Sequence, residues 1–180
     1  PGGFGTRGSE GIIDTATYAL EKNIPYLGIC FGFQLAAVAF GRKMCNLENA
    51  NSTEIVADTK NPIIDLLPEQ KDETDMGGSL RLGANEIKIN QDSLAYKIYN
   101  SDKISKRHRH RYEFNTKYRD EFLKKGMIFS GESDNGKRME ILEVPTHKFF
   151  LGVQYHPEFN SRPGFPEDVF KTFVTVASQN

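Results

Sequence analysis

The stretch IPYLGICFGFQLAAVAF, residues 24–40, decides the fold. A short apolar run ends at Ile29, Cys30 lies between Gly28 and Gly32, and apolar residues then recur at helical spacing. This pattern predicts a strand, a sharp turn and a helix, with a thiol at the turn. Such a turn requires small neighbours, because its backbone is strained and packs closely against adjacent strands.

A thiol at a strand-to-helix turn has two interpretations. A lone cysteine in an apolar run is most often a small buried side chain. The glycines beside Cys30 favour a nucleophile instead, because the N-terminus of the following helix lowers a thiol pKa and offers free N–H groups to an oxyanion. The choice between them depends on a base and an acid elsewhere in the chain.

Composition limits the class of protein. The chain has 180 residues, of which 38% are hydrophobic and 26% charged, as expected for one globular domain. Its net charge of −1 gives no general attraction to nucleic acid or to anionic membranes. No apolar run reaches the roughly 20 residues that span a bilayer, and no signal-peptide pattern opens the chain. The two cysteines, Cys30 and Cys45, do not make a disulfide framework, so we expect a cytoplasmic protein. Cys45 lies in a polar stretch with no glycine turn and no nearby base, so we expect it to be structural.

Alternating helical and strand patterns predict an α/β fold, a three-layer sandwich around a mostly parallel central sheet. Residues 9–23 are predicted to form a helix capped by Ser9, and the helix after the turn is predicted to end at Gly41. Further helices are expected at residues 63–67 (one turn), 93–99, 118–125 and 166–177. Further strands are expected at residues 26–29, 54–56, 79–82, 86–89, 104–115, 127–131, 138–144 and 149–155.

The opening PGGFGTRG, residues 1–8, is a glycine-rich loop. The N–H groups of Gly2 and Gly3 could cradle an oxyanion or a carboxylate, whereas glycines by themselves favour a plain turn. Because a loop of this kind usually follows a strand, we expect these residues to be part of a longer polypeptide.

The alternating segment ISKRHRHRYEFN, residues 104–115, predicts a strand. One face carries Arg107, Arg109, Arg111 and Glu113, and the other carries His108, His110, Tyr112 and Phe114. Three interpretations remain open: a nucleic-acid patch, a metal site using the two histidines, and a polar edge strand. We favour the edge strand, with one arginine that binds a substrate carboxylate through its planar fork.

The segment FFLGVQYHPEF, residues 149–159, predicts a buried strand that ends in His156-Pro157-Glu158. Pro157 keeps the preceding residue extended, so Glu158 and His156 face the same way. A carboxylate on one ring nitrogen leaves the other free to take a proton from a thiol. Together with the glycine-flanked Cys30, this pair predicts a thiol catalytic triad.

The motifs GICFGFQ and HPEF resemble those of the class I glutamine amidotransferases, whose Cys-His-Glu triad releases ammonia from glutamine. PGGFGTRGSEG, IPYLGICFGFQ, NANSTE, GGSLRLG, RHRHRYEFN and VQYHPEFNSRP extend the resemblance nearly end to end, to the glutaminase domain of the CTP synthase family. NSTE and RHRHRYE distinguish this family from other amidotransferases much better than the triad motifs do, because many amidotransferases share the triad motifs. The sequence differs at Phe31 and Phe33, where the family often has Leu and Met, and in a short segment after Pro68.

The resemblance implies roles for matched residues. Cys30 would be the nucleophile, His156 the general base and acid, and Glu158 the group that orients the imidazole. The N–H groups of Gly3 and Phe31 would form the oxyanion hole. The glutamine-binding set would be Gly3, Phe31, Gln34, Glu54 and Arg111.

The resemblance also implies a larger enzyme. Residues 1–180 would form the glutaminase domain without its N-terminal strands and without the synthetase domain. That domain would use ATP and Mg²⁺ to aminate UTP to CTP with the ammonia, in pyrimidine nucleotide biosynthesis. No cofactor or metal is implied for this chain, GTP would be an allosteric activator to which Arg7 could contribute, and the full enzyme would be a homotetramer.

Two other classes of function compete with this one. Another thiol hydrolase, such as a peptidase or a γ-glutamyl hydrolase, would use the same triad on a different substrate. A regulatory or filament-forming module would have no use for the complete Cys30, His156 and Glu158 set.

Overall fold

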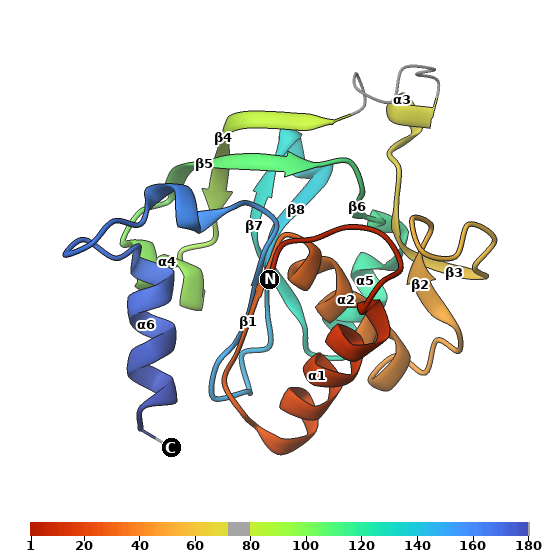
Figure 1. Ribbon diagram of the computed structural model, residues 1–180, viewed down its shortest axis with the longest axis horizontal. Coiled ribbons are helices and arrows are strands. Elements are labelled where there is room, and N and C mark those ends of the chain that lie inside the picture. The colour runs from red at the N-terminus through yellow and green to blue at the C-terminus, as the bar shows by residue number, and fades with distance from the viewer. Residues whose placement is uncertain (72–79, 180) are drawn as a thin grey trace.

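The computed structural model describes residues 1–71 and 80–179, which place helices on both faces of a six-stranded sheet (Figure 1). The helices are α1 (Ser9–Lys22), α2 (Phe31–Lys43), α3 (Pro68–Lys71), α4 (Leu94–Tyr99), α5 (Arg119–Lys124) and α6 (Asp168–Ala177). The strands are β1 (Tyr26–Ile29), β2 (Ala50–Ser52), β3 (Asn61–Asp65), β4 (Arg81–Ile89), β5 (Lys103–His110), β6 (Glu113–Phe114), β7 (Ile128–Ser133), β8 (Arg138–Glu143) and β9 (Phe150–Val153). Short 3-10 turns occupy Thr116–Tyr118, Asp134–Gly136 and Pro157–Asn160.

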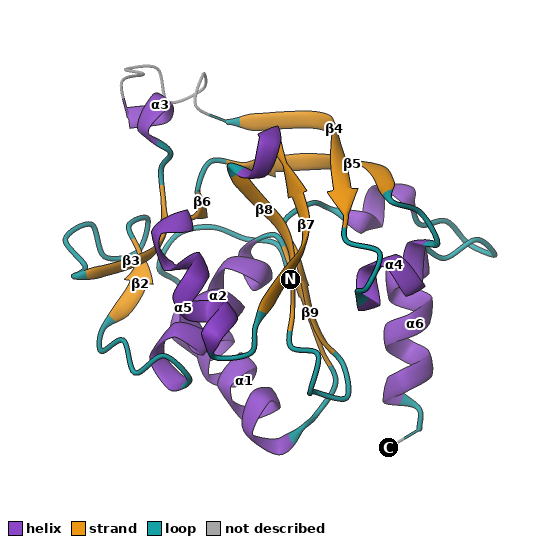
Figure 2. Cartoon of the chain, turned by 180° about the vertical axis from the view of Figure 1, so that it is seen from behind, coloured by secondary structure: helices purple, strands orange, loops and turns teal. Residues whose placement is uncertain are grey.

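Two cores lie on opposite faces of the large sheet and confirm the three-layer α/β fold. Neighbouring residues of β8 alternate between them: Leu142 packs in the core under α1, α2 and α5, and Ile141 packs in the core under α4 and α6. Figure 2 shows the same division of the helices from behind.

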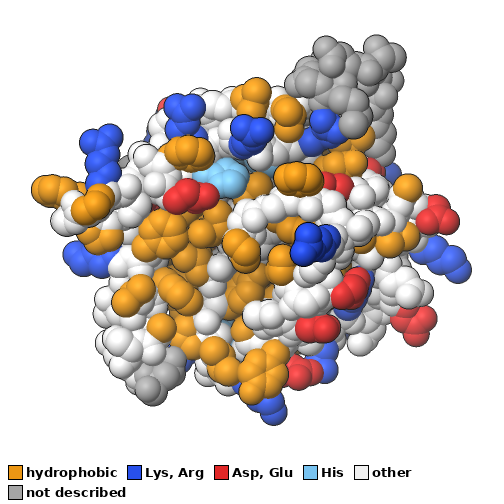
Figure 3. Space-filling model, viewed as in Figure 1, with side chains coloured by type: hydrophobic (Ala, Val, Ile, Leu, Met, Phe, Trp, Pro, Cys, Tyr) orange, Lys and Arg blue, Asp and Glu red, His pale blue; other side chains and the backbone are white. Residues whose placement is uncertain are grey.

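On the face seen in Figure 3, apolar side chains gather between α1 and α6. Leu27 and Ile29 of β1 and Phe173 of α6 are only partly buried against the core under α4 and α6.

The strand directions differ from the predicted, mostly parallel sheet. The large sheet has the order β1-β9-β8-β7-β4-β5, and among its described pairings β1 with β9 alone is parallel. The reason is connection length, because β7, β8 and β9 follow one another through short links, which only antiparallel neighbours allow. A smaller sheet has the order β2-β3-β6.

None of the described helices is long and apolar enough to cross a membrane.

Several local predictions were wrong where pairing between distant strands overrides local pattern. Residues 54–56 form a turn in which the Ser52 carbonyl accepts the N–H groups of Ile55 and Val56, and the strand lies before it, at β2. Residues 61–65 form β3 rather than a helical turn, because they pair with β2 and β6. The two strands predicted around Gly83 are one strand, β4, which pairs with β5 along its length. Ser79 lies outside the described residues.

Other boundaries moved for identifiable reasons. The predicted strand over residues 104–115 is interrupted at Arg111 and Tyr112, and so splits into β5 and β6. Helix α2 passes through Gly41 to Lys43, because Ile63 and Phe122 pack against Gly41 within the core. Helix α1 is capped by Gly8 at φ 75°, and the Ser9 hydroxyl donates to the Thr6 carbonyl instead.

The predicted requirement for a small residue at Gly28 gives a test of the fold. A Cβ at Gly28 would lie 2.6 Å from the Gly32 carbonyl oxygen and 2.9 Å from the Phe33 amide nitrogen, both backbone atoms that cannot move aside. Gly28→Ala should lower the free energy of unfolding by about 2–3 kcal/mol. The measurement is urea denaturation of the purified protein.

Gly11→Ala is the matched control, because Gly11 is exposed within α1 and a Cβ there meets nothing within 4 Å. It should raise the free energy of unfolding by roughly 0.5–1 kcal/mol. Equal effects of the two substitutions would contradict the close packing inferred at the turn.

Candidate active site

Cys30 lies at the turn between β1 and α2 with a backbone that few residues adopt. Its φ is 52° and its ψ is −100°, outside the regions favoured by L-residues. The Cys30 N–H donates to the Val153 carbonyl of β9 at 2.8 Å, which continues the β1–β9 ladder to the residue itself. The parallel register thus places Cys30 beside the end of β9.

The segment after β9 carries the imidazole and the carboxylate. His156 Nδ1 lies 2.7 Å from Glu158 Oε1, and the His156 N–H donates to the Arg107 carbonyl at 2.9 Å. The other ring nitrogen, Nε2, is buried and has no hydrogen-bond partner among the described residues. Because Glu158 occupies Nδ1, Nε2 is the nitrogen that remains to exchange a proton.

The glycine loop covers both groups. A Cβ added at Gly2 would lie 3.0 Å from His156 Cε1 and 3.9 Å from Cys30 Cβ, so one methyl group would contact both side chains. A Cβ at Gly3 would lie 3.3 Å from the Phe31 ring. The structure therefore brings Cys30, His156 and the loop together at one edge of the sheet.

A pocket of about 350 Å³ opens beside the thiol. Of the predicted site residues, it is lined by Gly3, Cys30, Gln34, Glu54 and Arg111. Phe31 does not line it, but its backbone N–H reaches the Cys30 sulfur. Two larger hollows lie elsewhere on the surface, and neither is lined by a cysteine or a histidine, so the side chains and not the volume identify the site.

Sequence reasoning missed other residues of the pocket wall, namely Phe4, Leu80, Arg109, His110 and Tyr112. Arg109 and Tyr112 belong to the alternating segment that was assigned one substrate-binding arginine. The break between β5 and β6 turns Arg109, His110, Arg111 and Tyr112 toward the pocket, so both predicted faces of the segment contribute to it. No sequence signal marks that break.

The environment of Cys30 keeps its sulfur protonated in the resting protein. Burial raises the pKa of the thiol to about 12, although hydrogen bonding from the Phe31 N–H acts in the opposite direction. The thiol also donates to the Arg109 carbonyl, with 3.9 Å between sulfur and oxygen. Nucleophilic attack therefore requires a base that takes the proton during the reaction.

The acidic side of the pocket is tied to the glycine loop. Glu54 Oε1 accepts the Gly5 N–H at 2.8 Å, and Gln34 Nε2 donates to the Tyr112 carbonyl at 2.9 Å. The Arg111 carbonyl accepts a hydrogen bond from Gln70 Nε2. These contacts fix the Glu54 carboxylate, the Gln34 amide and the Arg111 backbone at the pocket.

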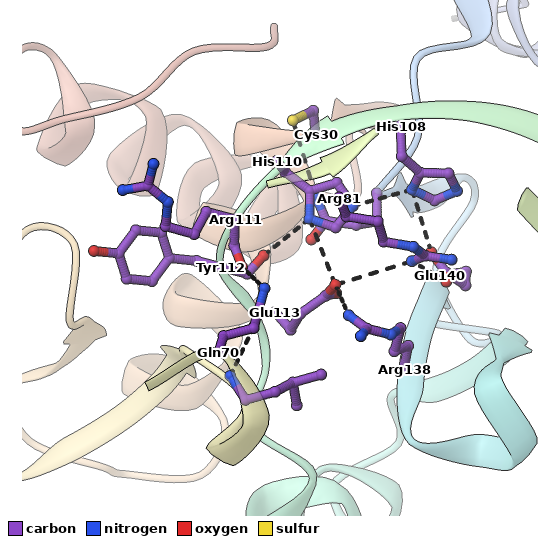
Figure 4. A network of polar contacts seen from close by, with 12 residues as sticks. Cys30, Gln70, Arg81, His108, His110, Arg111, Tyr112, Glu113, Arg138 and Glu140 are labelled. Atoms are coloured by element: carbon purple, nitrogen blue, oxygen red, sulfur yellow. Dashed lines mark hydrogen bonds and ion pairs between the residues drawn. The ribbon is translucent and has the colours of Figure 1, made fainter. Parts of the chain in front are cut away.

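A buried polar network stands behind the pocket wall (Figure 4). His108 Nδ1 lies 3.0 Å from His110 Nε2, and His110 Nδ1 lies 3.1 Å from the Tyr112 carbonyl oxygen. Arg81 contacts Glu140 at 2.5 Å, and Arg138 Nη1 contacts Glu113 Oε1 at 2.6 Å. No group of three metal-ligating side chains occurs among residues 1–71 and 80–179, and the two histidines bond to each other.

The chain matches the family model described as "Glutamine amidotransferase class-I" over residues 1–176. It therefore belongs to the class I glutamine amidotransferase family.

Within that family the chain is similar to the glutaminase domain of CTP synthases. It is 51% identical to a CTP synthase of Staphylococcus carnosus over 179 residues and 52% identical to one of Archaeoglobus fulgidus over 177 residues. These alignments cover 99% and 98% of this chain but 33% of each relative, so the chain spans about a third of their length.

A solved structure supports the same relation. The Trypanosoma brucei CTPS glutaminase domain with bound acivicin aligns with a TM-score of 0.93 and 36% identity, over 100% of this chain and 70% of that one. A GMP synthase protein from Thermoplasma acidophilum, at 16% identity and a TM-score of 0.60 over 94% of this chain and 65% of that one, shares the fold.

The buried histidine pair predicts a dependence of stability on pH. Burial and the Arg81 guanidinium lower the pKa of His108 to about 2, and burial lowers that of His110 to about 3. As the pH falls below 6.5, these two histidines take up protons in the unfolded chain but stay neutral in the native protein. The free energy of unfolding therefore falls with the pH. Each histidine contributes a slope of about 1.4 kcal/mol per pH unit.

The measurement is the free energy of unfolding in urea from pH 7 to pH 5, for the native sequence and for His108→Gln. The variant lacks one of the two titrating rings, so its slope should be shallower even if its absolute stability is lower. Equal slopes would contradict a neutral, buried His108.

Proposed function

We propose that this chain is the glutaminase part of a CTP synthase, hydrolysing L-glutamine through a thioester on Cys30. The observation that carries the proposal is the meeting of a strained cysteine turn with a carboxylate-bound imidazole beside one pocket. The similarity to CTP synthases over nearly the whole chain supports the substrate.

In the first half of the reaction, His156 Nε2 takes the thiol proton as the Cys30 sulfur attacks the side-chain amide carbon of glutamine. The N–H groups of Gly3 and Phe31 stabilise the negative oxygen that forms. The carbon–nitrogen bond then breaks, and His156 returns the proton to the leaving group, which departs as ammonia. Loss of one such N–H donor typically costs about 3 kcal/mol, or ~10²-fold in rate.

In the second half, His156 takes a proton from water, and the oxygen of that water attacks the thioester carbon. The carbon–sulfur bond breaks, glutamate leaves, and His156 returns the proton to the sulfur, which restores the thiol. Glu158 stabilises the imidazolium that forms twice in each cycle.

Substrate recognition follows from charge. Glu54 complements the α-ammonium of glutamine, and Arg111 complements its α-carboxylate through two parallel hydrogen bonds. Gln34, Gly3 and Phe31 complete the set that holds the amino-acid end and the amide. A free amino acid therefore suits this pocket better than an internal peptide bond.

The rest of the proposed enzyme lies outside this chain. Ammonia passes to a synthetase domain, where ATP and Mg²⁺ activate UTP for amination to CTP. We propose a cytoplasmic homotetramer in which GTP stimulates glutamine hydrolysis, with Arg7 of the glycine loop as one contact. Residues 1–180 would then belong to its glutaminase domain.

Replacing the nucleophile separates this function from a regulatory module. Cys30→Ala should reduce glutamine hydrolysis by at least about 10³-fold, because no other group forms the thioester. In the full-length protein, CTP formation from added ammonia should persist.

A glutamine-like chloroketone should label Cys30 and leave Cys45 unmodified.

Ammonia release from glutamine by the Cys30→Ala protein at the native rate would refute the nucleophile. Loss of ammonia-dependent CTP formation as well would point to misfolding, which the melting temperature of the variant decides.

Substrate choice separates the glutaminase from a γ-glutamyl hydrolase. The rate of hydrolysis should be greater for L-glutamine than for a γ-glutamyl dipeptide by at least about 10²-fold, because the proposed contacts serve the amide, the α-ammonium and the α-carboxylate of glutamine and none serves a second residue. The measurement compares kcat/KM for the two substrates. A preference for the dipeptide would favour the hydrolase.

A further inference from the structure

Gln154 is a completely buried amide between β9 and His156, and the roles assigned above make no use of it. Its Nε2 lies 3.9 Å from the Cys30 sulfur, within the range of a weak hydrogen bond to sulfur. Its Oε1 accepts a hydrogen bond from Gln34 Nε2 at 3.2 Å. One side chain thus contacts both the nucleophile and a residue of the substrate pocket.

The contacts of Gln34 determine which way its amide faces. Its Nε2 carries two protons, which it donates to the Tyr112 carbonyl at 2.9 Å and to Gln154 Oε1 at 3.2 Å. With both protons engaged, Gln34 offers its Oε1 to the pocket that it lines. An acceptor in this position suits the α-ammonium of an amino acid and is unfavourable for a second carboxylate.

The Tyr112 carbonyl that holds Gln34 is itself fixed by the histidine pair. It accepts a proton from His110 Nδ1, which leaves His110 Nε2 as the acceptor for His108 Nδ1–H. Both rings are then neutral and oriented in one direction. Gln34 is therefore held between two fixed acceptors, Gln154 Oε1 and the Tyr112 carbonyl.

We propose that Gln154 is a positioning residue for glutamine hydrolysis: its N–H orients the Cys30 thiol, and its carbonyl orients the Gln34 amide toward the substrate. The inference rests on the proposed function and deepens it. It couples the geometry of the nucleophile to recognition of the α-amino group through one amide.

Two substitutions separate the halves of this role in the full-length protein. Gln154→Glu keeps an acceptor for Gln34 but removes the N–H at the sulfur and adds a negative charge beside it. Gln154→Leu has a similar shape and removes both contacts. Gln91→Leu, at an exposed glutamine, is the matched control.

The readouts are KM and kcat for L-glutamine, and the pH profile of Cys30 alkylation by iodoacetamide. Gln154→Glu should lower kcat about tenfold or more, leave KM within about twofold, and move the alkylation profile upward by about one pH unit. Gln154→Leu should lower kcat and also raise KM about tenfold, because Gln34 loses a fixed partner. Gln91→Leu should change none of these quantities.

Native kcat, KM and alkylation profile in folded Gln154→Leu would overturn the inference. A KM that rises equally in both variants would also overturn it, because only Gln154→Leu releases Gln34. If the native protein does not hydrolyse glutamine, the proposed function fails. The alkylation profiles need no glutamine, and they still decide whether Gln154 acts on the thiol.

Discussion

The backbone of Cys30 is the constraint on which the site depends. A backbone at φ 52° and ψ −100° is strained, and contacts with the surrounding structure must offset the cost of that strain. It does so on two sides, through the Val153 carbonyl that accepts the Cys30 N–H and through α2, which packs its first turn on Gly28. The strained turn directs the sulfur toward the pocket and the Phe31 N–H.

The register of β1 with β9 then brings in the other groups of the proposed triad. Since Ile29 pairs with Val153, the residues that follow each strand emerge at the same edge, and His156 comes to lie near Cys30 although the two are far apart in sequence. The third component is the wall formed where β5 breaks before β6. That wall depends on the buried network of His108, His110 and the ion pairs behind it, which lowers stability in acid and holds the Tyr112 carbonyl in place.

The sequence alone predicted the parts of the molecule that local chemistry determines. The glycine-flanked Cys30 and the His156-Pro157-Glu158 segment each carry their own signal, and the structure has α2 and the carboxylate-bound imidazole at these places. Strand direction and the extent of β4 depend on partners far along the chain. Gln154 gave no signal, and His110 was considered as a metal ligand, because the role of a buried amide or imidazole depends on neighbours that only the fold brings to it.

The proposed chemistry requires a covalent bond between the Cys30 sulfur and the side-chain carbonyl carbon of glutamine. Acid quenching during turnover with radiolabelled glutamine, followed by peptide mapping of the protein, detects that bond. Label should appear on the peptide that contains Cys30 and should be released by mild base, as expected for a thioester. Steady release of ammonia with no label on that peptide, or with label on Cys45, would contradict the thioester mechanism.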